Sequence, residues 1–194
     1  MTRNELSDVL EHLAMMAPTS QPQKGWRFGN PEQLVLEFGQ HFAPKALPPD
    51  VELGEKKQCF ANALWLSYRR RDLIYCEGFA SSFLVALHAW CVDKAGNVVD
   101  PTWSGRLAGT EYFGIPFRTR WVARLMAQKK ETGVIANWEH GFPLLRHGIP
   151  QMALHRIHQP EHPDVAAAID SWRQGWEWLK QQNEVMHEVA HVHE

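Results

Sequence analysis

Three side chains of the kinds that carry out nucleophilic catalysis occur within a short part of the chain: Cys59, His88 and Asp100. Two lysines precede the cysteine, which lies near the expected start of a helix, where the partial positive charge stabilises a thiolate. The free backbone N–H groups of that first turn, together with Gln58, can bind an oxyanion. His88 can take the thiol proton and Asp100 can orient the imidazole, which completes a catalytic triad. The alternative interpretation is a buried thiol and two solvated polar residues.

A helix and a β-hairpin would have to position these residues. Residues 56–72 predict a helix that is apolar on most of its surface, as is typical of a central, buried helix. Residues 73–80, 83–92 and 97–100 predict strands. The loop Lys94-Ala95-Gly96 fits a type I turn followed by a left-handed glycine, which places Asp100 opposite Trp90 and on the face of His88. A two-residue loop would instead turn Asp100 to the other face.

Three short segments resemble the transglutaminase family in its own order along the chain. Gln58-Cys59-Phe60 resembles the Gly-Gln-Cys-Trp segment that opens the catalytic helix. His88-Ala89-Trp90 resembles the His-x-Trp strand, and residues 96–103 resemble the strand that ends in Asp-Pro-Thr. The stretch from Cys59 to Trp103 is also similar to the transglutaminase-like leader peptidases of lasso-peptide biosynthesis. The resemblance covers residues 55–105 and implies a papain-like fold in which Cys59, His88 and Asp100 are catalytic.

The chain departs from the family pattern in two places. Lys57 replaces the glycine before Gln58, and Cys59 and His88 are closer in sequence than in animal transglutaminases. The superfamily contains peptidases, amidases, deamidases, acyltransferases and inactive members, so the resemblance leaves the reaction open. One alternative is arylamine-acetyltransferase-like acyl transfer. Another is a catalytically idle protein that binds a peptide or partner through its tryptophans, of which Trp103 is the one expected to line a cleft.

Composition restricts the class of protein. The 194 residues are 44% hydrophobic and 22% charged, which excludes a mostly disordered chain, a collagen-like chain and a coiled coil. A net charge of −2 gives no general attraction for nucleic acid or an anionic membrane. The three cysteines form no Cys-x-x-Cys pair, and neither a signal peptide nor a membrane span is expected. We therefore expect a cytoplasmic protein that binds neither nucleic acid nor a membrane, and we expect no cofactor or metal. The resemblance implies that the substrate is a peptide, a protein or a small amide.

Other parts of the chain predict further elements. Residues 4–16 and 119–130 predict helices, and residues 33–38 a strand or a helical turn. Residues 112–117 predict an apolar loop that forms a cleft wall or, equally well, packs in the core. A C-terminal helix is expected over 163–190, opened by Pro163. His187 and His191 match the His-Glu-x-x-His zinc pattern, but the chain leaves no room downstream for a third ligand. A solvated helical tail is therefore expected there.

Together these features predict a single α+β domain over residues 1–194. Its core, residues 55–105, would be papain-like and transglutaminase-like, with a central cysteine-bearing helix on an antiparallel sheet and extra helices at both termini. The expected function is that of an intracellular thiol enzyme that attacks an amide or related acyl group through an acyl-enzyme intermediate. The same residues would serve hydrolysis and acyl transfer.

Overall fold

The computed structural model describes residues 5–16, 22–105, 108–129, 133–137 and 140–157. The chain divides into two compact units, 1–158 and 159–194, and all of the described residues belong to the first. The helix predicted over 163–190 and the two histidines of the zinc pattern lie outside the described residues. Within the described part, no helix has the length and apolar character needed to cross a membrane.

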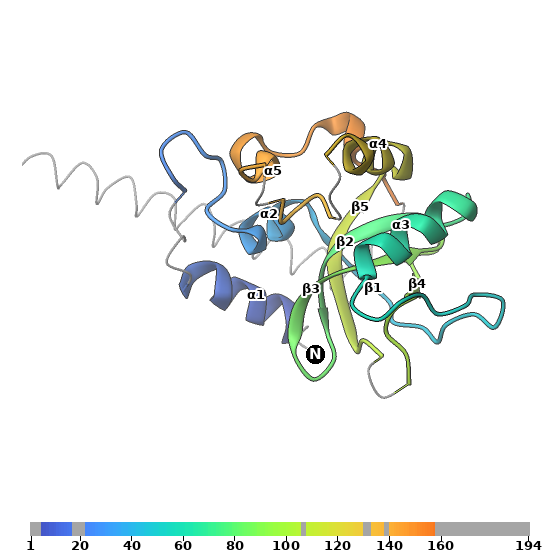
Figure 1. The fold of residues 1–194 in the computed structure, drawn as a ribbon. Helices are drawn as coiled ribbons and strands as arrows, with labels where there is room; N and C mark the ends of the chain where they lie inside the picture. Colours follow the sequence, from blue (N-terminus) through green and yellow to red (C-terminus); the bar gives the residue numbers. More distant parts are fainter. Residues whose placement is uncertain (1–4, 17–21, 106–107, 130–132, 138–139, 158–194) are drawn as a thin grey trace, which may run out of the picture. The chain divides into compact units, whose positions relative to one another are not determined.

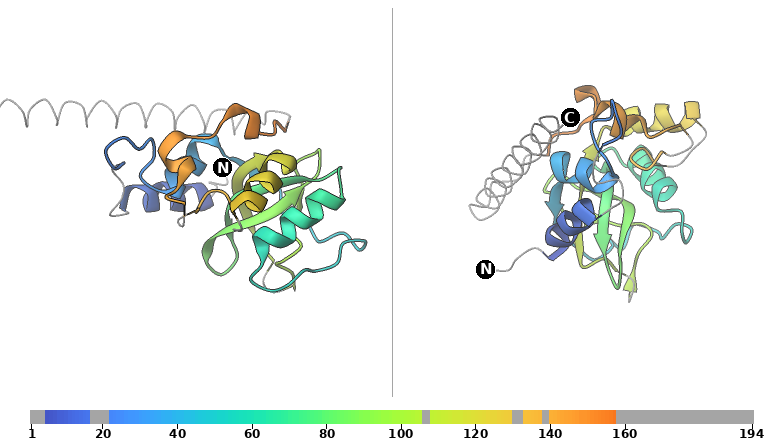
Figure 2. Two further views of the ribbon diagram at one scale, coloured as in Figure 1. Left: turned by 45° about the horizontal axis from the view of Figure 1, so that its top comes forward. Right: turned by 90° about the vertical axis from the view of Figure 1, so that its left-hand side faces the viewer.

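The centre of the first unit is a curled, antiparallel, five-stranded sheet (Figures 1 and 2). Its strands, in the order β1-β5-β2-β3-β4, are β1 (Gln40–Phe42), β5 (Glu111–Phe117), β2 (Ile74–Ser81), β3 (Val85–Val92) and β4 (Val98–Val99). The strands predicted at 73–80, 83–92 and 97–100 are confirmed as β2, β3 and β4. The unit is thus a mixed α/β structure on an antiparallel sheet.

Helices accompany the sheet along the chain: α1 (Glu5–Met16), α2 (Pro31–Phe38), α3 (Cys59–Arg69), α4 (Thr119–Lys129), α5 (Pro143–His147) and the 3-10 turn η2 (Gln151–Ala153). The helices predicted at 4–16 and 119–130 are confirmed, and that predicted at 56–72 is shorter at both ends. Residues 33–38, left open between strand and helix, are helical. Asn30 caps that helix by accepting the Gln33 N–H at 2.9 Å, and Pro31 occupies its first turn.

The two faces of the sheet have different partners because side chains alternate along each strand. On one face, the central strands pack against α1, α2, α3 and α4; the thiol of Cys91 on β3, for example, donates to the Ala63 carbonyl of α3 at 3.2 Å. Figures 1 and 2 show α3 and α4 side by side here. The other face carries a smaller cluster that contains Phe42, Trp90 and Tyr112.

The segment expected to be an apolar loop at the cleft wall is instead β5, which lies between β1 and β2. The loop prediction was wrong, and the alternative of core packing is confirmed because the segment is buried within the sheet. A proline is rare at an interior position of a sheet. At Pro116, however, β1 has already ended, since it pairs only with residues 112–114. The Pro116 carbonyl accepts from the His155 N–H at 2.9 Å, so its nitrogen also faces away from β2. The proline therefore removes no hydrogen bond from the β2–β5 ladder.

Two glycines face each other at the centre of the sheet. Gly78 of β2 pairs with Gly114 of β5 on one side and with His88 of β3 on the other. A Cβ at Gly78 would collide with the Gly114 backbone, and a Cβ at Gly114 would lie 2.6 Å from the Trp90 ring. Because glycine has no side chain, both positions leave room on this face for aromatic rings next to His88.

Candidate active site

Cys59 is the first residue of α3 and is half-buried. Gln58 occupies the N-cap position, is exposed, and accepts the Asn62 N–H through its carbonyl at 2.8 Å. Within the described ranges, the Gln58 side chain makes no capping hydrogen bond to the helix. The first-turn N–H groups therefore have no side-chain cap from Gln58, and the oxyanion site stays a prediction.

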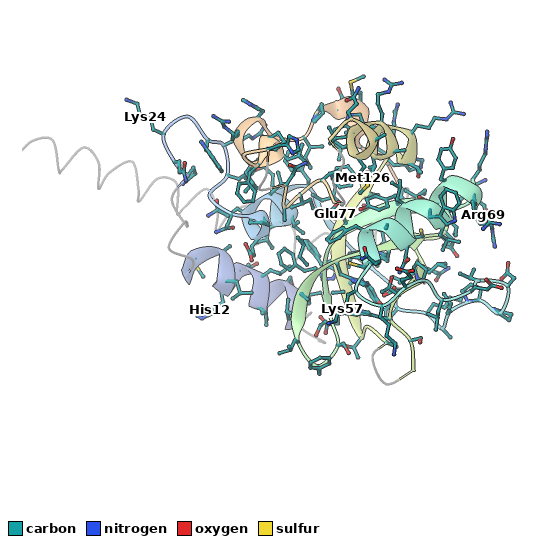
Figure 3. The ribbon with its side chains drawn as sticks, in the orientation of Figure 1. His12, Lys24, Lys57, Arg69, Glu77 and Met126 are labelled. Carbon is teal, nitrogen blue, oxygen red and sulfur yellow. The ribbon has the colours of Figure 1, made fainter. Side chains whose placement is uncertain are left out.

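Lys57, labelled in Figure 3, has a left-handed backbone conformation with φ of 66°. Glycine adopts this conformation at much lower cost than other residues. The family that the sequence resembles has glycine at this position. The lysine is thus a departure in residue type, while the backbone keeps the conformation that a glycine would favour.

The predicted hairpin turn between β3 and β4 is confirmed. The Gly96 N–H donates to the Asp93 carbonyl at 3.0 Å, the Asp93 N–H donates to the Asn97 carbonyl at 3.0 Å, and Gly96 has φ of 81°. Val99 pairs with Cys91. Asp100 therefore continues the ladder opposite Trp90 and shares the face of His88, as the three-residue loop predicts.

His88 and Asp100 form a buried pair. His88 Nε2 lies 2.8 Å from Asp100 Oδ2, and the two side chains are 1% and 5% exposed. The other carboxylate oxygen, Oδ1, accepts the backbone N–H groups of Thr102 and Trp103 at 2.8 and 3.0 Å. Both oxygens are thus held by donors, which fixes the carboxylate and the imidazole that it contacts.

The imidazole also contacts Cys59. Burial alone would lower the pKa of His88, but hydrogen bonds with Asp100 and Cys59, together with their charges, raise it to about 9. Since Asp100 occupies Nε2, Nδ1 is the nitrogen left for the thiol. His88 is therefore charged at neutral pH.

The open edge of β3 lets these groups meet. His88 lies on the face opposite to the one on which α3 packs, because Cys91 of the same strand contacts Ala63. β4 pairs only with Cys91 and Val92, so no described strand covers the outer edge of β3 at His88. Asn62 Nδ2 of α3 donates to Thr102 Oγ1 at 3.0 Å beside this edge. The first turn of α3 thereby brings Cys59 around the edge to the imidazole.

Two aromatic side chains complete the surroundings of the pair. Trp103 is half-buried and stacks on His88, with ring centroids 4.0 Å apart and planes inclined at 20°. Its expected role in lining a cleft stays a prediction. Tyr112 of β5 donates its hydroxyl to Asp100 Oδ2 at 2.9 Å, and burial and the Asp100 charge raise the pKa of this phenol.

Sequence reasoning missed the role of Tyr112. Its contact with Asp100 crosses β2, and β5 itself was interpreted as a loop, so no spacing in the chain pointed to it. The one available signal was the glycine at position 114, two residues further along the same strand.

The two other cysteines, Cys76 and Cys91, are fully buried, as predicted. Burial raises the pKa of both thiols, and the charge of Asp100 raises that of Cys91 further. Both are therefore protonated at neutral pH. Among the residues that the structure describes, no group of three or more His, Cys, Asp or Glu side chains is arranged to hold a metal ion.

Searches with this chain against models of protein families, against curated proteins and against solved structures found no match.

Proposed function

We propose that this protein is a thiol enzyme with a papain-like, transglutaminase-type core that attacks an amide or related acyl group. The single observation that carries the proposal is that a buried carboxylate and a thiol share one imidazole. Nε2 of His88 contacts the buried Asp100 carboxylate at 2.8 Å, and the thiol at the start of α3 is close enough to the same ring to raise its pKa. A solvated or merely structural set of residues has no need for this arrangement.

In the first half-reaction, the Cys59 thiolate attacks the carbonyl carbon, and the C=O electron pair moves onto oxygen. The N–H of Cys59, assisted by Gln58, stabilises that oxyanion. The imidazolium of His88 then donates its proton to the leaving nitrogen as the C–N bond breaks. The products are a thioester on Cys59 and a free amine.

In the second half-reaction, the now neutral His88 takes a proton from water or from an acceptor amine, which attacks the thioester carbon. The C–S bond breaks, the acid or the new amide leaves, and the thiolate–imidazolium pair is restored. Asp100 keeps Nε2 protonated throughout, so that Nδ1 is the nitrogen that exchanges protons with the reacting groups. Hydrolysis and acyl transfer differ only in the acceptor.

The substrate class that we infer is a peptide, a protein side-chain amide or a small amide. Gln58 and the first turn of α3 are accessible at the reacting end, and Trp103 offers a half-buried indole beside His88. An indole against an imidazolium also provides a cation–π contact that favours its charged form. No part of the proposal requires a metal ion or a cofactor.

The test is the alkylation of the three cysteines by iodoacetamide at pH 6, followed by peptide mass spectrometry. A thiolate–imidazolium pair reacts at this pH, whereas Cys76 and Cys91 are buried, protonated and serve as internal controls. We expect fast labelling of Cys59 that is lost in Cys59→Ser and slowed in His88→Ala and Asp100→Asn. Uniformly slow labelling of all three thiols in the folded wild-type protein contradicts the proposal and favours the idle binding protein.

A further inference from the structure

A second buried carboxylate, Glu77, lies on β2 and plays no part in the reaction proposed above. Figure 3 labels it on the sheet. Glu77 pairs with Ala89, the neighbour of His88, and its side chain points to the helix-covered face, opposite to the imidazole. It has no exposed surface. A charged group in such a place is costly unless hydrogen bonds compensate, so its partners indicate its purpose.

Those partners hold one short segment against the sheet. The carboxylate accepts the Val134 N–H at 2.9 Å, the Ile135 N–H at 2.9 Å and the Tyr75 hydroxyl at 3.1 Å. Burial raises the pKa of Glu77 to about 7, although these three hydrogen bonds act in the opposite direction. Val134 and Ile135 are themselves completely buried, so the segment is fixed both by packing and by the carboxylate.

The 133–135 segment also packs against the first turn of α3, the helix that carries Cys59. Gly133 has φ of 92°, and a Cβ there would lie 3.2 Å from Glu77 Oε1 and 3.3 Å from the Phe60 ring. The Gly133 backbone is therefore packed between the carboxylate and Phe60, the residue that follows Cys59. Tyr75, which donates to Glu77 at 3.1 Å, also lies near Cys59. Burial raises the pKa of its phenol most, the charge of Glu77 and the hydrogen bond to it add to this, and the charge of Cys59 makes a smaller contribution.

We propose that Glu77 is a positioning residue for Cys59: by holding residues 133–135 and Tyr75 beneath the first turn of α3, it sets the thiol at the correct place relative to His88. This inference rests on the proposed thiol chemistry. The first turn of α3 would then be held from both faces of the sheet. On one face, Asp100, which is held by Tyr112, fixes the position of His88. On the other face, Glu77 binds Tyr75 and the 133–135 segment.

The test compares Glu77→Gln with Val92→Ala. The glutamine has the same shape, and its carbonyl oxygen can still accept both backbone N–H groups in the place of Oε1. Its NH₂, however, cannot accept the Val134 N–H and the Tyr75 hydroxyl that Oε2 accepts, so a donor faces the Val134 N–H and the segment must shift. Val92 is a buried residue of β3 on the opposite face, and its truncation controls for loss of stability alone. We measure the labelling rate of Cys59 by iodoacetamide across pH 5–9 in each folded variant. A nucleophile that is out of position reacts much more slowly. We therefore expect the Cys59 of Glu77→Gln to be labelled about tenfold more slowly at pH 6. We also expect the pH dependence of its labelling rate to shift to higher pH.

An unchanged profile in folded Glu77→Gln overturns the inference and leaves Glu77 a structural residue. If Glu77→Gln does not fold, Tyr75→Phe tests the inference instead, because it removes only one hydrogen bond to Glu77. Labelling of Cys59 that is two- to fivefold slower supports the positioning role of Glu77, and an unchanged labelling rate overturns it. Slowing of the same size in Val92→Ala also counts against positioning. Failure of the proposed function is recognised separately, since the wild-type Cys59 would then react no faster than Cys76 and Cys91.

Discussion

Tyr112 and His88 donate hydrogen bonds to the same oxygen of Asp100, at 2.9 and 2.8 Å. The two residues come from strands that are separated by β2, so a single carboxylate oxygen connects β3 and β5 with the residue that follows β4. The shared oxygen also means that the phenol and the imidazolium compete for the same negative charge. Tyr112 therefore moderates the effect of Asp100 on His88 as well as fixing the carboxylate.

This sharing predicts the behaviour of Tyr112→Phe. Without the phenol, more of the Asp100 charge is available to His88, and we expect the pKa of His88 to rise above its value of about 9. Loss of a hydrogen bond to a buried charged group should also lower the unfolding free energy by about 1–3 kcal/mol. Histidine NMR titration measures the first effect and urea unfolding the second. Tyr68→Phe, at an exposed position of α3, is the matched control. A lowered His88 pKa would refute the competition.

The hairpin turn predicts a different pair of variants. Gly96 and Gly25 both have left-handed backbones, with φ of 81° and 84°, and an alanine at either should cost about 1 kcal/mol of stability. Only Gly96 belongs to the turn that places Asp100 on the face of His88. We therefore expect Gly96→Ala to slow the labelling of Cys59 at pH 6 about fivefold or more, while Gly25→Ala labels like the wild type. Equal rates in the two variants would show that the turn does not control the site.

The His88–Asp100 pair predicts a loss of stability at alkaline pH. Burial alone would lower the pKa of His88, but Asp100 and Cys59 raise it from 6.5 to about 9. A group that binds its proton more tightly in the folded state contributes its full stability below pH 6.5 and loses it as the pH rises through 9. The difference corresponds to about 3 kcal/mol. Urea unfolding between pH 7 and 10 should show a steeper decline for the wild type than for Asp100→Asn; parallel declines would contradict this.

Lys57 predicts a stabilising substitution. Its φ of 66° should cost about 1–2 kcal/mol relative to glycine, which offsets the greater freedom of glycine in the unfolded chain. Lys57→Gly should therefore unfold at least as late as the wild type in a thermal melt. Lys56→Gly, one residue earlier and equally exposed, has no such strain to relieve and should melt earlier. A lower melting temperature for Lys57→Gly than for Lys56→Gly would rule out strain at this position.

Interactions between residues that are close together in the sequence made part of the site predictable. The turn at residues 93–97 fixes its own register through Gly96, and the register determines which face carries Asp100. A contact between His88 and Asp100 could therefore be inferred from sequence alone. The start of a helix near Cys59 was predictable for the same kind of reason, since helix ends depend on neighbouring residues.

The contacts that sequence could not reveal all depend on the order of strands. Tyr112 reaches Asp100 only because β5 joins β2, and Glu77 reaches the 133–135 segment because the chain returns to the far face of the same sheet. Residues 33–38 were ambiguous because six apolar and polar residues fit two periods; Asn30 and Pro31, just outside that stretch, decide for the helix. The apolar run 112–117 fitted a loop as well as core packing, and Pro116 is tolerated in β5 because β1 ends before it.

The facing glycines Gly78 and Gly114 have an evolutionary consequence. Cys59 lies on a helix at the sheet edge, so a descendant chain can exchange its thiol without disturbing any strand. The glycines have no such freedom, because a Cβ at either meets backbone or the Trp90 ring. If the proposed function holds, a lineage that loses it should thus mutate position 59 first and keep both glycines, because they leave room for the aromatic rings packed beside His88. Loss of the nucleophile with retention of the glycine pair would be the mark of such a pseudoenzyme.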